Sequence, residues 1–136
     1  MAYGRPSPIR FAAAIAERLD TVVPAGLRVR AEGYRVHLYS GHSIRGGSEN
    51  ASLLMEEDGR TVDELVETSA VTILNSVQTD LMEHLREQWP IGEGNQAAEP
   101  SARVENDRLL MWFGDETRPV ITLPPLLLVD LVDGAA

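Results

Sequence analysis

Apolar residues recur along the chain with two different spacings, and these spacings predict the order of its helices and strands. Residues 8–20 repeat apolar positions every three or four residues, which predicts an amphipathic helix. Residues 27–32 and 35–40 alternate apolar and polar positions, which is typical of half-buried β-strands. Gly33 and Tyr34 between them suit a type II′ turn, so the sequence predicts a β-hairpin after the first helix.

Residues 61–89 carry the longest helical pattern. Thr61 followed by Glu64 is a capping-box signature, and Pro90 marks a stop. A helix of this length would measure about 43 Å at 1.5 Å per residue, longer than the roughly 30 Å diameter of a small domain. We therefore expect a kink, or an end that projects and packs on something else. The polar residues off its apolar stripe are Asp63, Glu64, Glu67, Gln78, Asp80, Glu83 and Glu87.

The segments around this helix are less regular. Residues 41–50 are polar and glycine-rich, which predicts a loop, and residues 51–57 are predicted as a short third strand. A second loop is expected at 92–101. Three further strands are predicted at 102–106, 108–113 and 118–123, with Asn106 and Asp107 in a type I′ turn and a short helix in the tail.

These elements predict one domain, residues 1–136, of the α+β class. We expect a mainly antiparallel sheet of five to six strands with one long amphipathic helix packed across it. Residues 30–41 align without a gap with residues 103–114, and both hairpins place Glu opposite Arg beside the turn. An α-βββ internal repeat and a chance likeness between hairpins both remain open. The element order resembles that of small acidic secretion chaperones, which are dimeric adaptors that hold a partner chain in extended form.

Charge is distributed unevenly in this chain of 136 residues. All 12 basic residues are arginine, 21 residues are acidic, and the net charge is −9. Residues 1–45 hold 7 arginines against 3 acidic residues, whereas residues 46–136 hold 5 against 18. The acidic balance argues against nucleic-acid binding, and the missing cysteines exclude disulfides and thiolate metal sites. With no signal peptide and no apolar run of about 18 residues, we expect a soluble cytoplasmic protein without membrane contact.

The first hairpin presents the strongest candidate ligand surface, at Arg28, Arg30, His37 and Tyr39. Alternation places these four side chains on one face of the hairpin. Guanidinium groups bind carboxylate or phosphate, and the two rings add stacking and a switchable donor. The alternative is a solvated sheet face paired with acidic neighbours, supplied by the helix or by Glu56 and Glu57.

Other chemical motifs are weak. The loop that begins at His42 has glycines that suit an anion, but it lacks a P-loop pattern and the chain has no lysine. Asp80, His84 and Glu87 share one side of the long helix, yet no further metal ligands lie near them in sequence. No hydrolase or metalloprotease signature occurs. We expect no catalytic residues, no metal and no cofactor.

Apolar residues exceed what one helix over a small sheet is expected to cover. Large apolar patches on small domains mark partner contacts, so we predict a partner interface. The alternative is that the tail closes the second face of the sheet. The predicted interface residues are Trp89, Trp112, Leu126, Leu127 and Leu128.

Three functions follow from these observations. The leading hypothesis is a non-catalytic protein-binding adaptor, chaperone or immunity-like protein that acts as a homodimer. The second is a structural component of a larger assembly, such as a phage particle or a secretion machine. The third is a small anion-binding domain that uses the face of the first hairpin.

Overall fold

The computed structural model describes residues 4–41, 43–48, 51, 54 and 59–132. In this part of the chain the fold is α+β, as predicted, with two helices and two antiparallel sheets. The helices are α1 (Pro8–Asp20) and α2 (Val62–Leu85), and the short 3-10 turns are η2 (Glu93–Asn95) and η3 (Leu128–Leu131). The first sheet holds β1 (Leu27–Glu32), β2 (Arg35–Ser40) and β3 (Ser43–Ser48), and the second holds β4 (Pro100–Glu105), β5 (Arg108–Asp115), β6 (Arg118–Thr122) and β7 (Leu126–Leu127).

Local chemistry sets the ends of both helices. The Ser7 hydroxyl accepts a hydrogen bond from the Arg10 N–H at 3.3 Å and begins α1. The predicted capping box begins α2, because Thr61 and Glu64 bond reciprocally at 3.0 and 3.1 Å. The predicted helix over 61–89 is too long at its C-terminal end. Arg86 takes a left-handed backbone conformation, with φ 58° and ψ 36°, and this conformation stops the helix there.

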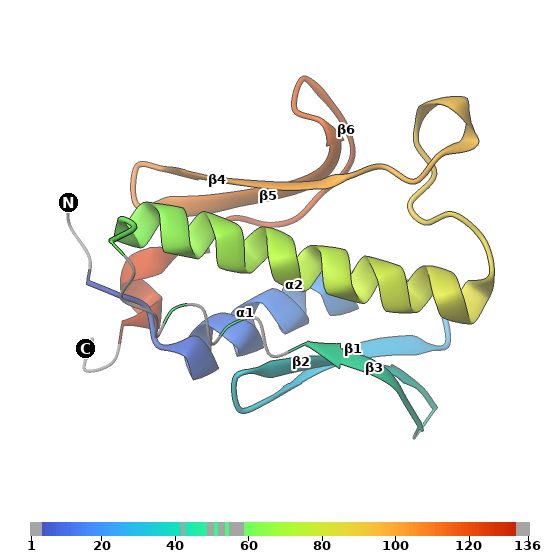
Figure 1. Ribbon diagram of the computed structural model, residues 1–136, viewed down its shortest axis with the longest axis horizontal. Coiled ribbons are helices and arrows are strands. Elements are labelled where there is room, and N and C mark those ends of the chain that lie inside the picture. The colour runs from blue at the N-terminus through green and yellow to red at the C-terminus, as the bar shows by residue number, and fades with distance from the viewer. Residues whose placement is uncertain (1–3, 42, 49–50, 52–53, 55–58, 133–136) are drawn as a thin grey trace.

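The prediction of one sheet with a helix across it is wrong, because the strands form two sheets of three and four strands. In Figure 1 the two sheets lie on opposite sides of α2, and α1 lies behind it. The reason is the width of the apolar surface of α2, which packs against β3 and β4 together. Neither helix in the described ranges is long and apolar enough to cross a membrane. The buried residues of α2 are Leu65, Val66, Ser69, Ala70, Ile73, Leu74, Val77, Gln78 and Leu81.

The first sheet corrects one loop prediction. The hairpin of β1 and β2 is confirmed, with Glu32 opposite Arg35 and a positive φ of 61° at Gly33. Residues 43–48, predicted as part of a loop, form β3 and pair with β2 across a bulge. This pairing gives the second edge of β2 hydrogen-bond partners, which a solvated loop would not supply. The predicted strand over 51–57 lies mostly outside the described residues.

The second sheet forms close to the predicted positions. Asn106 and Asp107 both have positive φ, 53° and 60°, as a type I′ turn requires. Leu109, Met111 and Phe113 of β5 point into the core, where each is at most 1% exposed. The alternate side chains of β5 therefore point to the outer face of this sheet.

The C-terminal tail closes the core. β7 pairs with β5, and the Leu128 N–H donates to the Asp107 carbonyl at 3.0 Å. The Arg18 guanidinium of α1 donates to the Pro124 and Pro125 carbonyls at 2.9 and 3.1 Å. The predicted tail helix is reduced to the single 3-10 turn of η3.

Three strands follow α1 and four follow α2, so the element order matches the predicted α-βββ repeat only in its first half. The two hairpins also share their register, since Glu105 lies opposite Arg108 just as Glu32 lies opposite Arg35. This likeness is local to the hairpins, and a duplication of the whole unit stays a prediction.

Candidate functional site

The structure brings the four predicted ligand residues together on the outer face of the first sheet. Arg28 lies directly opposite Tyr39, and Arg30 lies opposite His37. Directly opposed residues of an antiparallel pair project to the same face. The His37 and Tyr39 rings meet edge to face with their centroids 6.2 Å apart.

One of the two arginines already has a counterion. Arg28 donates through Nε and a terminal nitrogen to the Asp20 carboxylate at 3.0–3.2 Å. Asp20 also accepts the Val29 N–H at 2.9 Å. The hydrogen bond from Arg28 is the main reason that the pKa of Asp20 is lowered. The helix therefore supplies an acidic neighbour, as the alternative interpretation of this face anticipated.

Tyr39 also has a hydrogen-bond partner, whereas Arg30 interacts with the Asp20 charge only over a longer range. The Tyr39 hydroxyl donates to Glu32 Oε1 at 2.6 Å, and this bond raises the pKa of Tyr39. Arg30 has no hydrogen bond or ion pair with any residue in the part of the chain that the structure describes. Sequence spacing found the face but not the counterion of Arg28, because Asp20 reaches the hairpin from the end of α1.

Replacing Asp20 with asparagine is expected to lower the free energy of unfolding by about 1 kcal/mol at pH 7. Because the pKa of Asp20 is lowered on folding, its contribution is present above the unfolded pKa of about 3.9. That contribution disappears as the pH falls through the folded pKa. Urea denaturation of both chains from pH 7 to pH 2 measures the difference.

The matched control is Glu87→Gln, which removes one negative charge from an exposed position after α2. We expect it to change the free energy of unfolding by less than about 0.5 kcal/mol. A difference between wild type and Asp20→Asn that stays constant down to pH 2 would contradict the assigned role of the carboxylate.

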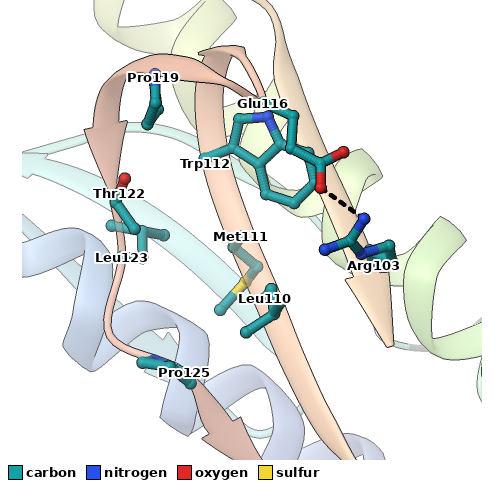
Figure 2. Close-up of a pocket in the computed structure, with 9 residues that line it drawn as sticks. All are labelled: Arg103, Leu110, Met111, Trp112, Glu116, Pro119, Thr122, Leu123 and Pro125. Atoms are coloured by element: carbon teal, nitrogen blue, oxygen red, sulfur yellow. Dashed lines mark ion pairs between the residues drawn. The ribbon is translucent and has the colours of Figure 1, made fainter. Parts of the chain in front are cut away.

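A second candidate site lies on the outer face of the second sheet. A pocket of about 220 Å³ surrounds Trp112 there (Figure 2). The Arg103–Glu116 ion pair lies on one side of the indole, and Arg103 also pairs with Glu105 at 2.8 Å. The Trp112 Nε1–H is buried and has no hydrogen-bond partner among the described residues. The pocket lining consists of Arg103, Leu110, Met111, Trp112, Glu116, Pro119, Thr122, Leu123 and Pro125.

The predicted interface residues separate into two groups. Leu126 and Leu128 fill the chain's own core, at 2% and 0% exposure, and Trp89 packs edge to face on Phe113 at 5.5 Å. Leu127 is 51% exposed, and its pairing with Arg108 places it on the outer face of the second sheet. Of the five predicted interface residues, Trp112 and Leu127 therefore lie on the outer face of the second sheet.

Charges on this outer face balance. Arg103 lies opposite Leu110, and Glu105 lies opposite Arg108, on the face that Trp112 occupies. With Glu116, the face holds two positive and two negative side chains in a chain of net charge −9. Two copies of this face can meet without the repulsion that the rest of the acidic surface would impose.

The weaker candidates gain no support as sites. Asp80 is half-buried on α2, and its pKa is raised by burial and by the neighbouring Glu83. The residues that the structure describes contain no group of three side chains arranged to hold a metal ion, and this includes Asp80, His84 and Glu87. His42, Glu56 and Glu57 lie outside the described residues.

Comparison with known proteins finds no protein family, no characterised protein and no solved structure that matches this chain.

Proposed function

We propose that this protein is a non-catalytic protein-binding adaptor that acts as a homodimer. The observation that carries the proposal is the apolar pocket around Trp112 on an uncovered sheet face, with Leu127 exposed on the same face. A twofold dimer needs a surface that complements itself. The balanced charges of Arg103, Glu105, Arg108 and Glu116 give this face that property.

The chemistry of the face also favours binding over catalysis. Trp is a typical anchor of protein interfaces, where it fills pockets from which water is excluded, and Leu127 adds exposed apolar area on the same face. The arginine and glutamate side chains form a polar rim around them. The dimer contact would leave the outer face of the first sheet free for a partner, which is the arrangement an adaptor requires.

Light scattering after size exclusion at micromolar concentration tests the dimer. We expect the wild-type chain to elute with twice the mass of one chain. Leu127→Asp places a charge on the face and is expected to raise the dimer dissociation constant at least 100-fold. It removes little core packing, because Leu127 is 51% exposed.

The matched control is Ile9→Asp, which makes the same change at a 58% exposed position on α1. We expect this variant to remain a dimer. A monomeric wild-type chain, or a Leu127→Asp chain that dimerises as well as the wild type, would contradict the proposal. Rings or tubes at high concentration would instead favour an assembly component.

A further inference from the structure

One edge of the first sheet carries main-chain groups without partners. β1 is the edge strand, and Glu32 and Arg35 flank the two-residue turn as a hydrogen-bonded pair. In an antiparallel ladder the next residue back, Ala31, points its N–H and C=O away from β2. Neither group has a hydrogen bond to a described residue outside the sheet.

The other groups on this edge show where an added chain would stop. The Leu27 N–H donates to the Pro24 carbonyl at 3.1 Å, and the Val29 N–H donates to Asp20 at 2.9 Å. The open portion therefore runs from the Val29 carbonyl through Ala31 to the turn. It offers the Ala31 N–H and the carbonyls of Val29 and Ala31, which are enough to fix the register of a short added strand.

Space is available beside these groups. A cavity of about 310 Å³ follows the β1 edge, between α1 and the strand. Ala13 and Ala16 form part of the α1 wall, and their short side chains leave room for small or β-branched side chains of an added strand. Glu17 and Asp20 of α1 also line this cavity, so the side chains that enter it must be uncharged, and a carboxylate fits only on the outward side of the strand. Strands pair at about 4.8 Å, so a peptide in this groove would reach Ala31 directly.

Arg30 indicates the chemistry of the occupant. Its side chain also lines a second cavity, of about 320 Å³, on the outer face of the sheet with Arg28, Tyr39 and Gly41. Arg28 is paired with Asp20, whereas Arg30 forms no ion pair with a described residue and interacts with the Asp20 charge only over a longer range. A carboxylate on the outward side of an added strand would lie beside the Arg30 guanidinium.

We propose that the open edge of β1 binds an extended peptide segment that bears a carboxylate, which extends the first sheet by one antiparallel strand. Ala31 supplies the paired main-chain bonds, the groove along α1 accepts the inward side chains, and Arg30 pairs with the outward carboxylate. The inference rests on the proposed function only in that the partner is a protein chain. It does not require the dimer face.

The probe is an acetylated and amidated pentapeptide, TVEVT, compared with its neutral counterpart TVQVT. Titration into the ¹⁵N-labelled full chain is followed by amide chemical shifts and hydrogen exchange. At saturation we expect a downfield shift of the Ala31 amide proton and at least tenfold slower exchange there. We expect TVEVT to bind about threefold more tightly than TVQVT, a preference that Arg30→Gln abolishes. Arg118→Gln, at an exposed position on β6, is the matched control and should keep the preference.

Unchanged Ala31 exchange at saturating peptide would overturn the proposal, and so would equal binding of TVEVT and TVQVT to the wild type. Repeating the titration with Leu127→Asp separates the two proposals. Binding to a monomeric variant supports the edge site whether or not the wild-type chain dimerises. If Leu127→Asp is monomeric and binds TVEVT as tightly as the wild type, the result bears on the dimer proposal and leaves the edge site unchanged.

Discussion

Leu128→Asp is expected to lower the free energy of unfolding by at least about 4 kcal/mol, which leaves much of the chain unfolded at neutral pH. Leu128 is fully buried, and its N–H is bonded to the Asp107 carbonyl, so the new carboxylate cannot reach water without displacing the tail. Far-UV circular dichroism and urea denaturation at pH 7 measure the effect. Leu127→Asp, one position earlier, is expected to fold normally.

Leu128→Ala provides the milder form of the same test. It leaves a cavity without a charge and is expected to cost about 2–5 kcal/mol. A wild-type urea midpoint for Leu128→Asp would show that the tail does not close the core. The same Leu→Asp change thus tests two different contacts: at position 128 it tests the packing of the tail, and at position 127 it tests the dimer contact.

The tail also shows what the sequence pattern leaves undetermined. Consecutive apolar residues indicate burial somewhere, but they do not say which side chains face the core. That choice comes from pairing with β5 and from the Arg18 bonds to Pro124 and Pro125, which join residues more than 100 positions apart. The prediction that Leu126 to Leu128 all belong to one interface could not separate them.

Features with local causes are predicted well. The capping box at Thr61, the turns at Gly33 and Asn106, and the opposed Glu and Arg beside each turn depend on residues within a few positions of one another. Whether the strands make one sheet or two depends instead on how α2 packs. A stripe along one helix does not state how many sheets will cover it.

The candidate site divides in the same way. Strand alternation placed Arg28, Arg30, His37 and Tyr39 on one face, and the register agrees. It did not reveal that Asp20 forms an ion pair with Arg28. That contact depends on tertiary packing, which brings the end of α1 against the edge of β1. The unpaired N–H and C=O groups of Ala31 arise because β1 lies at the edge of the first sheet. Alternation of apolar and polar residues does not predict the order of strands in a sheet.

Gln78 is the residue whose role the sequence pattern conceals most. It lies among the polar residues off the predicted stripe, yet it is only 4% exposed. Its side-chain nitrogen donates to the Trp89 and Ala98 carbonyls at 3.1 and 2.7 Å, which fixes the segment after α2 against the helix. Gln78→Met keeps the length of the side chain and removes both donors. We expect it to lower the free energy of unfolding by about 2–3 kcal/mol, since two carbonyls lose partners in a buried position.

Gln96→Met is the matched control, because Gln96 is exposed and its side chain has no hydrogen bond to a described residue. It is expected to change the free energy of unfolding by less than about 0.5 kcal/mol. Hydrogen exchange locates the loss, since the Ala98 N–H bonds to the Pro90 carbonyl at 2.8 Å within the same segment. Faster exchange at Ala98 in Gln78→Met, without faster exchange at Val29 under native conditions, would assign the defect to this segment. Wild-type stability in Gln78→Met would mean that the two carbonyls find other donors, and that the packing of Trp89 on Phe113 holds the segment alone.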